Sequence, residues 1–178
     1  QESLNQAIAA RDPSPLRTAL RQAIDAGLPD LEEAAMFLCE LEHWILDMES
    51  AEGLDKLQHA LEAGLRARLP KTILDYYRQR LHQRVEAEAA LQAAMAAART
   101  PPLAEALKAA EGMSLPSERP AAALWKALDI SEKLLRAALE AMSIEDLERA
   151  LASAKESGLL ELGLIEEASS MLASLNTD

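Results

Sequence analysis

The sequence predicts an all-α protein, and three observations support that prediction. Ala and Leu supply 36 and 32 of the 178 residues, and both are good helix formers. The residues that favour half-buried strands are scarce, since the chain has one Val, seven Ile and five aromatic residues. A helical pattern also recurs along the chain at spacings of 41 to 46 residues, a period typical of helical repeats. These observations exclude a β-sandwich, a barrel and a doubly wound sheet.

The recurring pattern is anchored on four leucines: Leu16, Leu57, Leu103 and Leu147. Each anchor is followed by Ala three residues later, by Leu four residues later, by Ala or Gly seven residues later and by Leu twelve residues later. Apolar residues at this spacing give a helix one buried stripe. We therefore expect four equivalent buried positions at Leu20, Leu61, Leu107 and Leu151.

Helix start and stop signals justify each element in turn. N-cap and Pro signals stand at 14–15, 100–102 and 143–146. Pro29, Pro70 and Pro116 each follow the Leu twelve residues after an anchor, where Pro fits the first turn of a new helix. Gly27 and Gly158 fit left-handed helix ends. The predicted short helices are about 14–27, 54–68, 102–112 and 144–157, and the predicted long helices are about 30–50, 71–99, 117–142 and 160–175.

Each short helix and the long helix after it form a predicted helical hairpin. This layout resembles HEAT, armadillo and tetratricopeptide repeats in repeat length and helix pairing, without the sequence signature of any one family. The resemblance implies one domain over 1–178, built as a short α-solenoid, with a compact multi-helix bundle as the alternative. The hairpins are expected at about 14–50, 54–99, 102–142 and 144–176, and 2–11 is expected to be the remnant of a preceding repeat. Because the chain also opens without Met, we expect it to be part of a longer protein.

Composition narrows the classes of partner. The net charge is -12, and phosphate backbones attract cationic surfaces, so nucleic acid is not an expected partner. No apolar run is long enough to span a bilayer. The single cysteine, Cys39, excludes an internal disulfide and favours a cytoplasmic location.

No motif for catalysis, phosphate binding or metal binding stands in the sequence. Cys39 and His43 lie one helical turn apart, but a structural zinc site needs four ligands, and we expect Cys39 to be a small core residue. We also expect both Trp44 and Trp125 to pack in the core. The prediction is therefore a protein that is not an enzyme and has no metal or cofactor.

The stretch from Arg66 to Arg84 is the one strongly basic segment, with six basic residues against one acid. Arg and Tyr are enriched in protein interfaces, so this stretch supplies the candidate partner-binding residues: Arg80, Arg84, Arg78, Tyr76 and Tyr77. If they bind a partner, the arginine head groups lie in water, and the buried side of the helix is the stripe Leu74, Tyr77, Leu81 and Val85. The alternative is that these arginines pair with acidic residues on neighbouring helices.

The expected function is a non-enzymatic scaffold or adaptor that binds a protein or peptide, as solenoids do along their continuous surface. Two alternatives stay open. One is a module that contacts anionic lipid or a phosphorylated partner through the 66–84 stretch. The other is a regulatory helical region of a multidomain enzyme.

Overall fold

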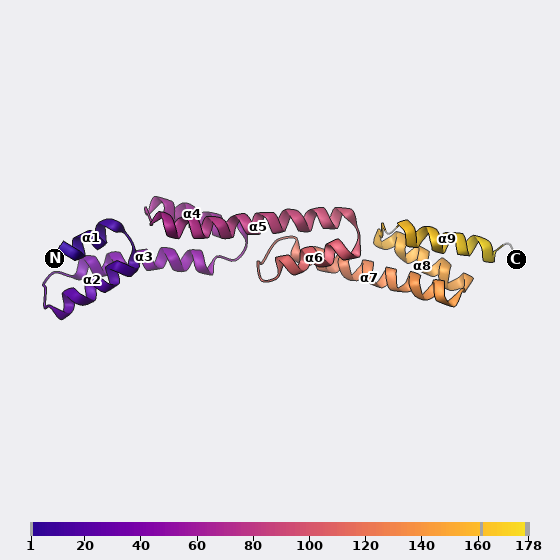
Figure 1. Ribbon diagram of the computed structural model, residues 1–178, viewed down its shortest axis with the longest axis horizontal. Coiled ribbons are helices and arrows are strands. Elements are labelled where there is room, and N and C mark those ends of the chain that lie inside the picture. Colours follow the sequence, from indigo (N-terminus) through magenta and orange to yellow (C-terminus); the bar gives the residue numbers. More distant parts are fainter. Residues whose placement is uncertain (1, 161, 177–178) are drawn as a thin grey trace. The chain divides into compact units, whose positions relative to one another are not determined.

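The computed structural model describes residues 2–160 and 162–176, and within them it contains nine helices and no strand (Figure 1). The prediction of an all-α chain is therefore confirmed. In chain order the helices are α1 (Glu2–Ala10), α2 (Pro13–Asp25), α3 (Glu32–Ser50), α4 (Leu54–Arg66), α5 (Lys71–Ala97), α6 (Thr100–Ala110), α7 (Glu118–Ala141), α8 (Ile144–Ser157) and α9 (Leu162–Leu175). Short and long helices alternate from α2 to α7, as the start and stop signals predict. The prediction of a long helix at about 160–175 is wrong, because α8 and α9 both have 14 residues.

The helices form two compact units, Gln1–Val85 and Glu86–Asp178, whose boundary falls inside α5. In the first unit, α1 packs against α2, α2 against α3, and α3 against α4. In the second unit, α7 packs against α6, α8 and α9, and α8 also packs against α9. Neighbours in the sequence are thus neighbours in space within each unit.

The four anchor leucines are the most deeply buried side chains of the short helices. Each is 0% exposed: Leu16, Leu57, Leu103 and Leu147. The column four residues later is less uniform, because Leu20 and Leu61 are buried whereas Leu107 and Leu151 are only half-buried. The expectation that all four positions of that second column are equally buried is wrong.

The ends of the short helices share a left-handed residue eleven positions after each anchor. The positive φ angles belong to Gly27, Arg68, Ser114 and Gly158. In three of the four cases the amide of the following Leu donates to the carbonyl of the small residue seven positions after the anchor, at 3.0–3.1 Å. This is the Schellman arrangement, in which a left-handed residue closes the last turn.

Gly64 shows why the position seven residues after an anchor must be small. A Cβ atom built at Gly64 would lie 3.1 Å from Leu69 Cδ1, 3.3 Å from Leu74 Cδ2 and 3.5 Å from Met48 Cε. Leu69 belongs to the closing turn of the same helix, whereas Leu74 and Met48 belong to α5 and α3. The small residue therefore admits both the helix end and the two neighbouring long helices.

The helix starts are partly as predicted. Ser143 caps α8 by accepting the amide of Asp146, as expected. The cap of α2 is Asp12, which accepts the amide of Ser14, so the prediction of Ser14 as the cap is wrong. Pro29, Pro70 and Pro116 also lie before the first residue of their helices and not in the first turn. Pro has no amide to donate, and the structure uses it in the connection that leads into each long helix.

Candidate functional site: a groove between α3 and α4

Arg84, one of the five predicted binding residues, has a structural role. It is 8% exposed, and its guanidinium donates to the carbonyls of Ala51, at 3.0 Å, and Gly53, at 2.9 Å. Burial, and then the neighbouring charge of Arg80, lower the pKa of Arg84 below its ordinary value. The expectation that its head group lies in water is wrong, because it satisfies backbone oxygens at the connection between α3 and α4.

Tyr77 is also buried, as the predicted stripe requires, so it is not available to a partner, and the structure departs from the stripe at Val85. Tyr77 is 3% exposed, and burial followed by the carboxylate of Glu49 raises the pKa of its hydroxyl to about 12. Leu74 is buried as predicted, but Val85 is 49% exposed. The buried line therefore passes through Arg84 and not Val85, because the two backbone carbonyls need a donor that Val cannot supply.

The other three predicted residues lie at the surface of α5. Arg78 donates to Asp75 on its own helix at 2.8 Å. Arg80 is half-buried, with its guanidinium carbon 6.0 Å from the ring centre of Tyr76 and 5.7 Å from that of Tyr77. Tyr76 is 58% exposed. A binding role for Arg78, Arg80 and Tyr76 stays a prediction.

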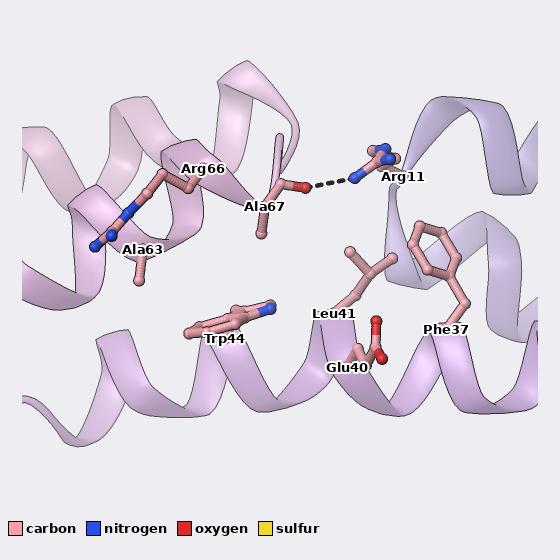
Figure 2. A pocket seen from close by; sticks show the side chains of 8 residues that line it. All are labelled: Arg11, Phe37, Glu40, Leu41, Trp44, Ala63, Arg66 and Ala67. Carbon is pink, nitrogen blue, oxygen red and sulfur yellow. Dashed lines mark hydrogen bonds between the residues drawn. The ribbon is translucent and has the colours of Figure 1, made fainter.

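A groove on the first unit gathers aromatic and basic side chains from three segments of the chain. Figure 2 shows its floor, formed by α3, beneath residues of α4, with the turn between α1 and α2 at one end. Its volume is about 440 Å³. The lining residues are Arg11, Phe37, Glu40, Leu41, Trp44, Ala63, Arg66 and Ala67.

The floor consists of Phe37, Leu41 and Trp44, which share one face of α3 because they stand at i, i+4 and i+7. Leu41 is 1% exposed and belongs to the core. Phe37 and Trp44 are half-buried and pack against that core from the groove side. The expectation that Trp44 is an ordinary core residue is therefore only half correct.

Small residues on α4 leave room above this floor. Ala63 and Ala67 line the opposite wall, and Figure 2 shows Trp44 beneath Ala63. A larger side chain at either alanine would occupy the space between the two helices. The groove thus depends on small residues on one helix facing aromatic residues on the other.

Arg11 closes one end of the groove and connects it to the basic stretch. It has a positive φ of 54° in the turn between α1 and α2, and its Nη1 donates to the carbonyl of Ala67 at 2.6 Å. Its guanidinium carbon also lies 5.4 Å from the ring centre of Phe37, within the range of a cation–π contact. A residue 56 positions away in the sequence is thereby placed beside Arg66 and Arg68.

Sequence reasoning missed this groove, although one signal for it was present. The stretch of α3 from Ala34 to Met48 is apolar on more than one face, whereas a helix that buries a single stripe keeps its other faces polar. No signal in the sequence pointed to Arg11, because its position depends on the contact with Ala67. Cys39, expected in the core, is instead exposed on α3.

Among the described residues there is no group of three or more His, Cys, Asp or Glu side chains that could hold a metal ion. No helix in the described part of the chain is long and apolar enough to cross a bilayer. No protein-family model, curated protein or solved structure matches the chain.

Proposed function

We propose that this protein is a non-enzymatic interaction module that binds a peptide segment of another protein in the α3–α4 groove. The observation that supports it most is the floor of Phe37, Leu41 and Trp44, two of whose three side chains remain partly open to solvent. Aromatic side chains bury large apolar areas and dominate interface energetics. A groove between helices is also a common place for a partner to bind.

We further propose that the helical hairpins stack as a short α-solenoid, which would extend this groove into a longer surface. Two tertiary contacts, one in each unit, support the proposal. In the first unit the turn before α2 meets the end of α4 through Arg11 and Ala67. In the second unit the turn before α6 meets the end of α8, where the amide of Leu160 donates to the carbonyl of Ala98 at 3.2 Å. Both contacts join one hairpin to the end of the short helix in the next.

The alternative of lipid binding through the 66–84 stretch has less support in the structure. Arg84 is buried against backbone carbonyls and Arg78 pairs with Asp75, so two of its six basic residues are already engaged. Flotation with anionic vesicles tests this alternative. Recovery of the protein with the vesicles would favour it over a peptide-binding module.

The test of the proposed function fills the groove without removing any core residue. Ala63→Phe places a ring over Trp44, and Ala89→Phe at an exposed position of α5 serves as the matched control. A random peptide library is selected on the unmodified chain, and the enriched peptides are assayed against both variants. We expect Ala63→Phe to lose binding by tenfold or more and Ala89→Phe to keep it.

Two results would overturn the proposal. One is that no peptide is enriched on the chain. The other is that enriched peptides bind Ala63→Phe as tightly as the unmodified chain, while circular dichroism shows that both variants remain helical.

A further inference from the structure

Three arginines lie around the end of α4, and Figure 2 shows the side chain of Arg66 pointing away from Arg11. Arg66 is its last helical residue, Arg68 has a positive φ of 56° in the turn that follows, and Arg11 reaches the same place through its bond to Ala67. Arg66 and Arg68 are both exposed. Among the described residues, neither guanidinium forms an ion pair with a carboxylate.

Part of this positive charge is already engaged by the protein. Arg11 binds the carbonyl of Ala67, and Nε of Arg66 donates to the carbonyl of Glu62 at 3.4 Å. Carbonyls at a helix C-terminus carry partial negative charge and attract cations. The terminal nitrogens of Arg66 and the whole head group of Arg68 are left facing solvent, and these are the groups that can meet a partner.

The charge balance at the groove is the reverse of that of the whole chain. Arg11 and Arg66 line it against one acid, Glu40, and Arg68 directly follows the lining residue Ala67. The lining residues therefore sum to +1, from two arginines and one glutamate, in a chain of net charge -12. An acidic segment would meet attraction here and repulsion over most of the remaining surface.

We infer that the groove binds an acidic peptide segment with apolar side chains, an inference that rests on the proposed function. The apolar side chains lie on Phe37 and Trp44, and flanking carboxylates pair with Arg66 and Arg68. Apolar burial supplies most of the affinity, and the arginines supply charge selectivity and speed of association. A basic or neutral segment of the same shape does not gain the charge attraction of the arginines.

The test uses three synthetic peptides with one shared Leu-Phe core, flanked by Glu, by Gln or by Lys. Trp125→Phe leaves Trp44 as the single tryptophan, so its emission reports occupancy of the groove. We expect the Glu peptide to shift that emission and to bind more tightly than the Gln and Lys peptides. Its advantage should shrink as salt rises, because added ions screen exposed charges.

Reversing the charge of the two exposed arginines tests whether they cause the preference for the Glu peptide. Arg66→Glu with Arg68→Glu should weaken binding of the Glu peptide by about tenfold or more, since both ion pairs are lost and the reversed charges repel the peptide. Arg119→Glu with Lys126→Glu makes the same change in net charge at exposed positions of α7 and serves as the matched control. We expect little effect from that control pair.

The outcomes separate this inference from the proposed function. If all three peptides shift the emission of Trp44 with equal affinity, the acidic preference is wrong while the groove still binds peptide. If none of the peptides shifts the emission, although library selection yields peptides sensitive to Ala63→Phe, the groove binds a peptide of another class than acidic.

Two other outcomes would give these arginines a different partner. Recovery on anionic vesicles that is lost in Arg66→Glu with Arg68→Glu would assign these arginines to lipid. Self-association lost in the same variant would assign them to a second copy of this acidic chain.

Discussion

Two charged side chains on α5, Arg84 and Glu88, are buried one helical turn apart, and both bind backbone or capping groups. Arg84 donates to the carbonyls of Ala51, the residue that follows α3, and of Gly53, the residue that precedes α4. Glu88 accepts the amide of Ser117, the residue that precedes α7, at 3.2 Å, and also accepts its hydroxyl. A cation at a helix C-terminus and an anion at a helix N-terminus both match the helix dipole. The two residues therefore act at helix ends and not at a binding surface.

Replacing Arg84 tests its structural role directly. Arg84→Met keeps much of the apolar stem but leaves the carbonyls of Ala51 and Gly53 without their donor. We expect a loss of about 1–3 kcal/mol in the free energy of unfolding, measured by urea denaturation. Arg80→Met, at a half-buried position above two tyrosine rings, is the matched control and should change stability less. Equal effects from the two variants would contradict the assignment.

Glu88 predicts a pH dependence of stability. Burial alone raises the pKa of its carboxyl, but the hydrogen bonds from Ser117 and Gln92 outweigh it and hold the pKa below the ordinary value of 4.5. Because the folded pKa is depressed, the stabilisation is fully present above 4.5 and is lost as pH falls through the folded value.

The variant Glu88→Gln should therefore be less stable than the unmodified chain near neutral pH. The difference should shrink as the solution is acidified below 4.5. Thermal melts over a pH series measure the difference in stability between the two chains. Glu140→Gln, at an exposed position of α7, is the matched control. A difference that stays constant to low pH would contradict the role of the ionised carboxylate.

At the scale of the element, three of the four short helices, α2, α4 and α8, end in the same way. A left-handed residue eleven positions after the anchor turns the chain, and the following Leu packs back over the small residue at the helix end, as Leu69 does over Gly64. This helix end does not require Gly, since Arg68 takes at α4 the left-handed conformation that Gly27 and Gly158 take at α2 and α8. The hydrogen bonds and the packing of the Leu therefore outweigh the steric preference for Gly.

Substitutions at Gly64 measure how closely the helices approach. Gly64→Ala gains about 1 kcal/mol of helix propensity, and the atoms it meets are flexible ends of Leu69, Leu74 and Met48. We expect a small net stabilisation, because Ala occupies the corresponding position in the other three short helices. Gly64→Leu should cost about 1–3 kcal/mol through overpacking. The free energy of unfolding of both variants is measured by chemical denaturation. A Leu variant as stable as the Ala variant would contradict the close approach of Leu74 and Met48 to Gly64.

At the scale of the whole molecule, the chain consists of two compact units built from contacts between sequence neighbours. In such proteins stability is roughly a sum of local terms, and regions open independently. Damage to one unit should therefore stay largely within it.

Leu16→Ala and Leu147→Ala test this expectation, because both leucines are 0% exposed and they belong to different units. Each substitution should cost about 2–5 kcal/mol. Hydrogen exchange should rise in α1–α3 for Leu16→Ala and in α7–α9 for Leu147→Ala, with little change in the other unit. A uniform rise over the whole chain in both variants would show that the protein opens as one cooperative body.

The sequence by itself determined the helical class, the alternation of short and long helices, the four buried anchor leucines and the left-handed ends at Gly27 and Gly158. These features depend on local propensity and on the 3.6-residue period, which a sequence displays directly. The cap of α2 was missed because Asp12 and Ser14 are both good caps, and only the path of the chain distinguishes them.

Only the tertiary structure decided which charged residues are available to a partner. Arg84, Val85 and Arg11 are the clearest cases: the sequence placed Arg84 in water and Val85 in the core, and it gave Arg11 no role. Their true positions depend on the backbone carbonyls of Ala51, Gly53 and Ala67, which lie just outside helix ends and accept hydrogen bonds from Arg84 and Arg11. Unsatisfied carbonyls of this kind arise where helix ends meet other helices. The residue pattern along a single helix therefore cannot predict which side chain binds them.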